Sequence, residues 1–299
     1  MIRAMINVFH LNPRDLLGKG GESEVYALDD ARVIRLYKPQ TSLAYIERRH
    51  AFYAQLHAQR PPFEIPLILE SGTLNDRIYT VEQRMCGRAF TDVLPALEGA
   101  GRQRALASYL DVAAQIGTIE FTDRPFGELL TTGEPLQRTA WPQFVWDRLQ
   151  QTYRLSRADV EQDVPGVDAV LAYMRAELGT LESFQEKCLV HGDYFPGNVY
   201  INDQCDICGV GDFGYTSVVG DPRMDLAGAV GYLELVDGYQ LDDTPFLMQL
   251  VEKRHGTEMV RWLDFYRLYC SFYFSTCKVD DLRTYAWCIR NLRSWLQAH

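Results

Sequence analysis

An aspartate and an asparagine lie five residues apart in the segment HGDYFPGN, which covers residues 191–198. They are Asp193 and Asn198, and Asp212 follows in a GDFG sequence nineteen residues after Asp193. A carboxylate near a hydroxyl can act as a general base, and amide and carboxylate oxygens are suitable Mg²⁺ ligands. The order H-x-D, then N, then D-F-G is typical of loops that catalyse phosphoryl transfer to a hydroxyl. The ordered set indicates this chemistry more strongly than its members alone, each of which also fits an ordinary turn.

A glycine-rich segment lies upstream, GKGGESEVY at residues 18–26. Glycines between two predicted strands let the backbone approach a phosphate and direct N–H groups toward it. The segment matches the kinase pattern G-x-G-x-x-G-x-V through Gly18, Gly20 and Val25, with Ser23 in place of the third glycine. No G-K-[S/T] closes it, so it is not a Walker A loop. Taken alone, it fits a hairpin turn equally well.

Phosphoryl transfer also requires a cation that holds the α- and β-phosphates. The next predicted strand, RVIRLYKP, offers Arg35 and Lys38, and the strand alternation together with the spacing from Val25 favours Arg35. A glutamate on the following helix is expected to pair with this cation. Glu47 is the only acidic residue of the predicted helix 42–57, so we predict that it pairs with Arg35, with its register on the helix left open.

The elements that must position these residues change character along the chain. The pattern of residues 1–85 predicts mostly antiparallel strands with one main helix, which Ser42 can cap. Residues 82–88 are predicted to form a hinge, and residues 86–299 are predicted to be mainly helical. Helical periodicity in the third region covers residues 102–121, 141–155, 157–162 and 166–184. We therefore predict an α+β fold with a small N-terminal β lobe that binds nucleotide and a larger helical C-terminal lobe. Ligands favour such interfaces between lobes.

The chain resembles the aminoglycoside phosphotransferase family, small-molecule relatives of protein kinases that include choline and homoserine kinases. The family pattern H-G-D-x-x-x-x-N is met at residues 191–198, and G-D-P-x-x-D-L-A is met at residues 220–227, GDPRMDLA. The matching motifs run in order from Gly18 to Ala227. The resemblance implies a two-lobed protein-kinase-like fold, ATP or GTP with Mg²⁺, and transfer of the γ-phosphate to a hydroxyl of a small molecule.

Carried over by position, the resemblance gives each motif residue a role. Asp193 is the catalytic base, Asn198 and Asp212 bind Mg²⁺, and His191 and Asp225 support the catalytic loop. Arg35 departs from the family, because lysine is more usual at its position. The expected nucleotide-binding set comprises Gly18, Gly20, Gly21, Ser23, Val25, Arg35, Glu47 and the connector residues Gln83, Arg84 and Met85, whose backbone would meet the purine.

The spacing of the last two motifs indicates a small acceptor. Only twelve residues separate Asp212 from Asp225, and no A-P-E sequence lies between them. This leaves no room for the long activation segment of protein kinases. The acceptor is expected in a cleft formed by the helices after residue 225. Acidic candidates for binding a cationic acceptor, which also fit a solvated surface, are Glu234, Asp237, Asp242, Asp243 and Asp264.

Composition limits the partners and the compartment. The net charge is −10 and residues 1–80 are nearly neutral, so no basic footprint for nucleic acid is present. The acidic excess is compatible with a cationic small substrate. No apolar run of membrane-spanning length and no secretion signal are visible, and seven scattered cysteines favour reduced thiols in the cytoplasm. Cys205 and Cys208 form a C-x-x-C that we expect in a hairpin turn.

Two other functions use the same residues. A nucleotide-binding pseudokinase or regulatory module on this fold would not transfer phosphate, although Asp193, Asn198 and Asp212 are all present. A metal hydrolase that uses His191, Asp193 and Asp212 would catalyse without nucleotide, and it leaves the glycine-rich segment unexplained. The active small-molecule kinase is therefore the preferred hypothesis.

Overall fold

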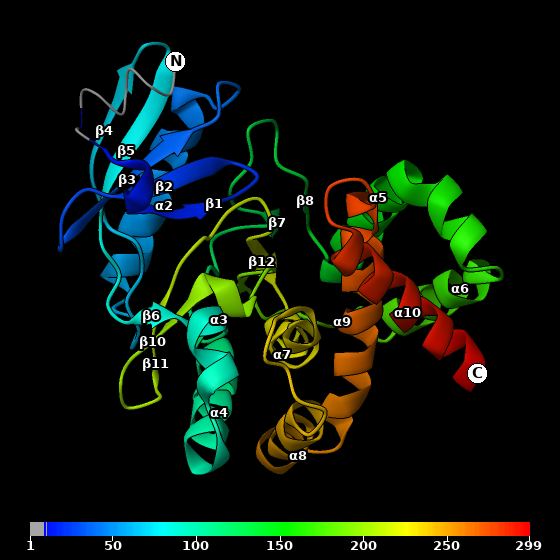
Figure 1. Cartoon of the computed structure of the whole chain (residues 1–299). Helices are drawn as coiled ribbons and strands as arrows, with labels where there is room; N and C mark the ends of the chain where they lie inside the picture. Colours follow the sequence, from blue (N-terminus) through cyan, green and yellow to red (C-terminus); the bar gives the residue numbers. More distant parts are fainter. Residues whose placement is uncertain (1–8, 10) are drawn as a thin grey trace.

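The chain folds into an antiparallel sheet followed by a mainly helical region (Figure 1). The structure is a computed structural model that describes Phe9 and residues 11–299. In Figure 1 the sheet lies at the upper left and the helices fill the lower and right-hand parts. This arrangement confirms the predicted α+β fold. No helix within the described residues combines the length and apolarity that a membrane crossing requires.

The N-terminal sheet has five strands in the order β1-β2-β3-β5-β4, and all neighbouring strands are antiparallel. Its strands, preceded by the short turn η1 (Pro13–Asp15), are β1 (Leu16–Lys19), β2 (Ser23–Ala27), β3 (Arg32–Tyr37), β4 (Ile68–Leu74) and β5 (Arg77–Gln83). The β-branched and aromatic side chains of β3 fit a packed sheet surface. Arg35 is paired with Val25 on β2 and with Thr80 on β5, so it occupies the middle of the sheet.

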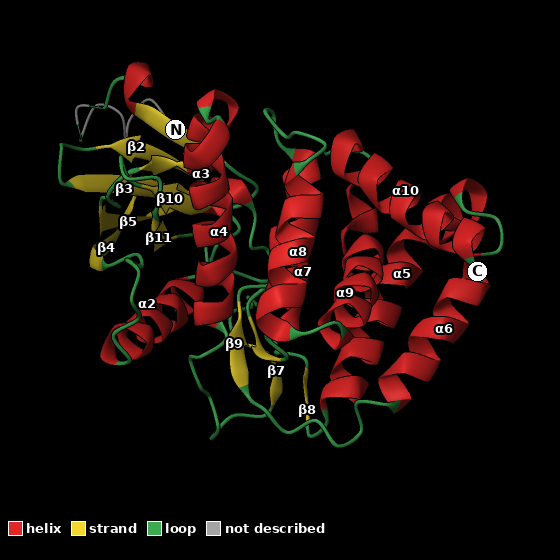
Figure 2. Cartoon of the chain, turned by 90° about the horizontal axis from the view of Figure 1, so that it is seen from below, coloured by secondary structure: helices red, strands yellow, loops and turns green. Residues whose placement is uncertain are grey.

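One long helix, α2 (Leu43–Ala58), accompanies this sheet (Figures 1 and 2). The Ser42 hydroxyl oxygen accepts the backbone N–H of Tyr45 at 3.2 Å, which confirms the predicted cap. The buried face of the helix carries, at helical spacing, Tyr45, Ile46, Arg49, Phe52, Tyr53 and Leu56. An arginine on such a face is unusual, because charged side chains are rarely fully buried unless they are paired.

A small three-stranded sheet joins the connector to the sequence motifs. The chain leaves β5 and passes through β6 (Arg88–Ala89), which pairs with β10 (Val199–Ile201). β10 in turn pairs with β11 (Ile207–Val210). β10 follows directly on the segment 191–198, and β11 leads into Asp212. The connector is therefore tied to both motifs through backbone hydrogen bonds.

A four-stranded sheet in the order β8-β7-β12-β9 lies beside the helices (Figure 2). Its strands are β7 (Phe126–Glu128), β8 (Gln137–Arg138), β9 (Cys188–Val190) and β12 (Val218–Gly220). β9 leads into His191, and β12 follows the Asp-Phe-Gly segment. Because β12 pairs with β7 on one edge and with β9 on the other, the short stretch after Asp212 is held within a sheet.

Helices form most of the remaining chain. In chain order they are α3 (Phe90–Val93), η2 (Leu94–Ala96), α4 (Gly99–Ile116), α5 (Trp141–Asp163), α6 (Val167–Gly179), η3 (Pro196–Asn198), α7 (Arg223–Gly231), η4 (Tyr232–Leu235), α8 (Asp243–His255), α9 (Glu258–Phe274), η5 (Ser275–Cys277) and α10 (Leu282–Ala298). α7 packs against α4 and α9, and α10 packs on α9. The predicted segments 141–155 and 157–162 are one helix, α5. Ser156 does not interrupt it, because its buried hydroxyl is bonded to the Ser275 hydroxyl at 2.7 Å.

The two cysteines of the C-x-x-C lie apart at the β10–β11 hairpin. Cys205 lies in the turn, with a φ of 62°. Cys208 lies on β11, and its Sγ is 3.1 Å from the Sγ of Cys86 in the connector. All the cysteines are free thiols. The hairpin location agrees with the prediction, but the neighbour of Cys208 is a thiol 122 residues away in the chain.

Candidate functional site

The loop that follows β9 is held by a buried carboxylate at the start of α7. Asp225 accepts the backbone N–H of His191 at 2.6 Å and that of Gly192 at 2.9 Å. Burial raises the pKa of Asp225 to about 7, although the two N–H bonds act to lower it. Gly192 has a φ of 76°, and a Cβ there would lie 2.3 Å from the carbonyl oxygen of Thr216. The loop therefore requires both the glycine and its carboxylate anchor.

His191 lies inside the loop and connects it to the Asp-Phe-Gly segment. Its Nε2 is 2.8 Å from the carbonyl oxygen of Gly211, the residue before Asp212. Burial lowers the pKa of the imidazole and favours its neutral form. Nε2–H can then donate to Gly211 while Nδ1 accepts the backbone N–H of Asp193 at 3.3 Å. The ring thus links the two aspartate-bearing segments from within.

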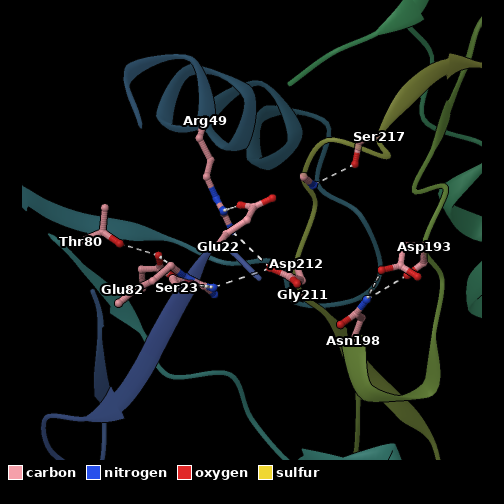
Figure 3. Close-up of polar contacts among 12 residues, drawn as sticks. Glu22, Ser23, Arg49, Thr80, Glu82, Asp193, Asn198, Gly211, Asp212 and Ser217 are labelled. Atoms are coloured by element: carbon pink, nitrogen blue, oxygen red, sulfur yellow. Dashed lines mark hydrogen bonds and ion pairs between the residues drawn. The ribbon is translucent and has the colours of Figure 1, made fainter. Parts of the chain in front are cut away.

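Asp193 and Asn198 face each other across the bend that contains η3 (Figure 3). The Asn198 Nδ2 donates to the Asp193 carbonyl oxygen at 2.9 Å and to its carboxylate Oδ2 at 3.4 Å. Burial raises the pKa of Asp193 to about 6, Asp212 adds to the rise, and Asn198 opposes it. The carboxylate is therefore charged at neutral pH, yet basic enough to accept a proton. Because Nδ2 is engaged, Oδ1 is the Asn198 atom left for a cation.

Asp212 projects between the N-terminal sheet and the loop (Figure 3). Its side chain is 56% exposed, and its Oδ1 lies 3.7 Å from Nη1 of Arg35 and 3.8 Å from Nη2 of Arg49. Desolvation acts to raise the pKa of Asp212, but the two guanidinium groups hold it below its usual value. Its φ of 56° is a left-handed conformation, which costs a non-glycine residue about 1–2 kcal/mol. An ionised carboxylate in such a conformation is a strong candidate for a functional ligand.

Arg35 is fixed by neighbours on the sheet. Its Nε donates to Glu82 Oε1 at 3.1 Å, and its Nη1 donates to the Ser23 hydroxyl at 3.0 Å. The Thr80 hydroxyl donates to the same Glu82 oxygen at 2.7 Å. Since β3 and β5 pair at Arg35 and Thr80 and side chains alternate along a strand, Arg35, Thr80 and Glu82 share one face. The guanidinium is therefore held in one orientation beside Asp212.

The predicted pair between Glu47 and Arg35 is wrong. Glu47 lies on the exposed face of α2, and the carboxylate beside Arg35 comes from Glu82 on β5. The helix instead presents Arg49, two residues later, to Asp212. A two-residue step turns a helix by ~200°, so these two side chains cannot share a face.

Lys38 follows the end of β3. Its backbone N–H donates to the carbonyl oxygen of Glu22 at 2.9 Å, which ties the strand end to the glycine-rich segment. Among the residues that the structure describes, the cations within ion-pair distance of Asp212 are Arg35 and Arg49. The structure therefore brings Arg35, and not Lys38, to the predicted metal ligand.

Within residues 83–86 of the connector, the described structure leaves the backbone N–H of Met85 without a partner. The N–H groups of Gln83, Arg84 and Cys86 are hydrogen-bonded to neighbouring residues at 2.8–2.9 Å. Across Phe9 and residues 11–299, the N–H of Met85 has no hydrogen-bond partner. A ligand at the connector would thus find the Met85 N–H available as a donor.

A model of the phosphotransferase enzyme family, APH, matches residues 15–263. The match includes the glycine-rich segment, the connector and both aspartate motifs. The chain belongs to this family. Membership confirms the predicted class of enzyme, a small-molecule phosphotransferase. No curated protein sequence matches the chain.

Solved aminoglycoside phosphotransferases share the fold of this APH family member. The GDP and kanamycin complex of APH(2'')-IIIa has a TM-score of 0.63 at 15% identity, and the match covers 100% of both chains. ADP-bound APH(2'')-Ib has a TM-score of 0.61 at 15% identity, over 98% of this chain and 95% of that one. The streptomycin–ATP–APH(2'')-IIa ternary complex has a TM-score of 0.56 at 16% identity, over 99% and 95%. These likenesses establish the kinase-like fold.

Arginines neutralise several of the acidic candidates for acceptor binding. Glu234 pairs with Arg267 at 2.6 Å and with Arg290 at 2.7 Å. Asp243 is buried, and Nε of Arg102 donates to its Oδ1 at 2.7 Å. Asp237 pairs with Arg283 at 3.0 Å. Asp242 and Asp264 are exposed. As a set, these carboxylates therefore do not form one acidic surface in this APH family member.

A cavity of about 710 Å³ opens between η4, α9 and α10. Glu234, Asp264 and Arg267 contribute to it, together with Trp295 and His299 near the end of α10. No residue of the segment 191–225 lines it. The cavity is therefore separate from the loop that carries Asp193.

Sequence reasoning missed three charged residues around Asp212 and Arg35, namely Glu22, Arg49 and Glu82. Glu82 carries a recognisable signal, because it alternates with Thr80 on β5 and must share its face. Arg49 also carries one, since it falls on the aromatic stripe of α2 together with Tyr45 and Phe52. Glu22 has no such signal. Its contact with Arg49 depends on how the glycine-rich segment folds toward the helix.

Proposed function

We propose that this protein transfers the γ-phosphate of ATP or GTP to a hydroxyl of a small molecule. The proposal rests on one observation: two segments of the chain lie together beside one cation. The loop of Asp193 and Asn198 and the Asp-Phe-Gly segment of Asp212 are linked by His191, and Asp212 faces Arg35. A base, two oxygen ligands and a phosphate-binding cation then line one space.

Asp193 acts as the base in this proposal. The acceptor oxygen forms a bond to the γ-phosphorus while the bond from that phosphorus to the β-phosphate oxygen breaks. The hydroxyl proton passes to the Asp193 carboxylate, whose pKa of about 6 suits this role at neutral pH. The nucleoside diphosphate leaves as the second product. The Asn198 amide bonds the Asp193 backbone carbonyl at 2.9 Å and its carboxylate at 3.4 Å, which helps to orient the base.

Asn198 and Asp212 would hold Mg²⁺. The free Oδ1 of Asn198 and the ionised Asp212 carboxylate are oxygen ligands, which Mg²⁺ prefers, and water and phosphate oxygens commonly complete its shell. When bound, the metal neutralises charge on the phosphates. A hydrolytic metal site is not favoured, because His191 is buried and bonded to Gly211. Within the described part of the chain, no group of three or more His, Cys, Asp or Glu side chains is placed to hold a metal.

The nucleotide would lie between the glycine-rich segment and the connector, on the boundary between a lobe of residues 1–85 and a lobe of residues 86–299. Gly18 and Gly21 face open space, so a phosphate can approach their backbone. Arg35, held by Ser23 and Glu82, would bind the phosphates. The N–H and carbonyl groups of Gln83, Arg84 and Met85 would meet the purine, with Met85 as donor.

The acceptor is proposed to be small and hydroxylated. The segment 213–222 is short and contains β12, which is hydrogen-bonded on both edges. It therefore offers no open stretch on which a peptide could lie. Among the solved structures of similar fold, kanamycin and streptomycin accompany nucleotides. We therefore rank cationic amino sugars and amino alcohols first among acceptors.

The test is a screen for nucleotide consumption with hydroxylated small molecules, using ATP and GTP in parallel. Turnover with at least one acceptor is expected, and Asp193→Asn should lower it by roughly 10²–10⁴-fold, the usual contribution of a general base. Asp203→Asn, at an exposed position in the β10–β11 turn, is the matched control. Full turnover in Asp193→Asn would refute the mechanism. Nucleotide binding without turnover for any acceptor would instead favour a pseudokinase.

A further inference from the structure

Arg49 is a fully buried arginine whose hydrogen-bonding capacity is mostly unused. Its side chain is 0% exposed, and its Nη2 donates to the Tyr53 hydroxyl at 3.2 Å. Its Nε and Nη1 have no hydrogen-bond partner anywhere in the described chain. A buried charged donor without a hydrogen-bond partner destabilises the protein. Its presence here indicates that a ligand provides the partner during function.

Two carboxylates lie near Arg49, but neither forms a hydrogen bond with it. Glu22 Oε2 is 3.8 Å from Nη1, and Asp212 Oδ1 is 3.8 Å from Nη2. The same Glu22 oxygen, Oε2, accepts a hydrogen bond from the Tyr45 hydroxyl at 3.2 Å. In Figure 3 the Arg49 side chain extends from its helix toward Glu22, with Asp212 beyond. These distances are those of a loose ion pair and not of a closed one.

We infer that Arg49 is a second phosphate-binding cation, and that the Glu22 carboxylate takes the place of a phosphate group until a nucleotide displaces it. This inference rests on the proposed function. Glu22 belongs to the glycine-rich segment that would cover the phosphates. Its carboxylate also interacts electrostatically with Asp212 and Arg35. A carboxylate and a phosphate present similar oxygens to a guanidinium, so one can stand in for the other.

The sheet explains why α2 can carry a cation at this position. Arg35 receives its carboxylate from Glu82 on β5, so it needs no glutamate from the helix. The helix position that faces Asp212 can therefore supply positive charge. A guanidinium presents planar N–H donors along two edges, Nε with Nη2 and Nη1 with Nη2. Each edge of Arg49 retains one unused donor, Nε or Nη1, that a phosphate oxygen can accept.

The glycine-rich segment has the freedom that the exchange requires. Glu22 follows Gly20 and Gly21, and a Cβ on Gly21 would meet no atom within 4 Å. The Glu22 side chain is 32% exposed, so its outer side is open to solvent. Rotation of the Glu22 side chain toward solvent would carry the carboxylate away from Arg49 while the Glu22 carbonyl keeps its bond to the Lys38 N–H.

The experiment compares binding of a nucleoside diphosphate with binding of the matching nucleoside, using ADP with adenosine and GDP with guanosine. Glu22→Gln removes the charge and keeps the shape. It should tighten diphosphate binding about tenfold, because one like charge no longer opposes the phosphates, and it should leave nucleoside binding unchanged. Arg49→Gln should weaken diphosphate binding by about tenfold or more and leave nucleoside binding unchanged. Arg48→Gln, one residue earlier and exposed, is the control and should bind both ligands as the wild type does.

Each outcome decides between a phosphate site and a structural ion pair. If Glu22→Gln lowers the melting temperature while diphosphate affinity is unchanged or weaker, the Glu22–Arg49 pair is structural and the inference is overturned. Should Arg49→Gln fail to fold, the Glu22→Gln measurement still decides alone. A wild-type protein that binds neither diphosphate would overturn the proposed function and this inference together. A diphosphate affinity that neither substitution changes would overturn this inference but not the proposed function.

Discussion

The carboxylate of Asp225 accepts the backbone N–H of His191 at 2.6 Å, across 34 residues of chain. His191 in turn reaches the carbonyl oxygen of Gly211 through its ring. One buried acid therefore sets the backbone of the loop that carries Asp193, and one buried ring transmits that placement to Asp212. The chemistry proposed for the two aspartates depends on residues that would touch neither substrate nor metal.

Asp225→Ala is expected to destabilise the protein by about 2–4 kcal/mol, because it leaves two buried N–H groups without an acceptor. Thermal or urea unfolding measures the loss. Asp203→Ala, on an exposed turn, should shift the transition little. An unchanged melting temperature for Asp225→Ala with intact nucleotide turnover would show that the loop does not need this anchor.

Arg35→Ala should weaken nucleotide binding by about tenfold or more, since it removes a charged donor that is already oriented toward the site. Lys38→Ala should have a smaller effect, because Lys38 lies beyond the end of β3. Titration calorimetry with ADP and GDP gives both constants. The reverse order of the two effects would move the phosphate-binding role to Lys38.

Glu82 and Glu47 make a matched pair of substitutions. Glu82→Gln should lower stability by about 1–3 kcal/mol, because it breaks a buried ion pair with Arg35 while the Thr80 hydroxyl still points at the same atom. Glu47→Gln, on the exposed face of α2, should stay within about 0.5 kcal/mol of wild type. Equal losses in urea unfolding would contradict the assignment of Glu82 as the partner of Arg35.

Asp212→Asn tests the charge of the proposed metal ligand without straining the backbone. Asparagine tolerates the positive φ of this position better than most residues, so the fold should survive. Turnover should fall by at least about 10²-fold, because an amide holds Mg²⁺ less well than a carboxylate does. Assays over a range of Mg²⁺ concentrations measure the change, and undiminished activity at ordinary Mg²⁺ would refute the role.

A mild thiol oxidant such as diamide should join Cys86 to Cys208, with the two thiols oxidised and diamide reduced to the hydrazine. The sulfur atoms are already 3.1 Å apart and require a small approach to form the bond. Peptide mapping by mass spectrometry identifies the linkage, and Cys205→Ser should leave it intact. A Cys205–Cys208 linkage would show that the β10–β11 hairpin is arranged differently.

The sequence was sufficient for the fold and for the order of the motifs. Strand alternation and the spacing from Val25 favour Arg35 over Lys38, and Ser42 marks the start of α2, because these signals are local. The partner of Arg35 was predicted wrongly because alternation puts Glu82 on the face of Thr80 but does not reveal that β5 pairs with β3, 47 residues earlier. The nearness of Cys86 to Cys208 and of Glu22 to Arg49 likewise arises only when separate segments meet.

The two cations beside Asp212 are guanidinium groups and not amines. A guanidinium keeps its proton at any pH at which the protein would be assayed, so the positive charge of this site does not vary with pH as a buried lysine's can. Reagents that acylate a lysine amine would leave Arg35 and Arg49 unchanged. A nucleotide analogue that reacts with lysine would then modify neighbouring side chains, such as Lys19, which is exposed on β1, or Lys38, and not the two cations of the site.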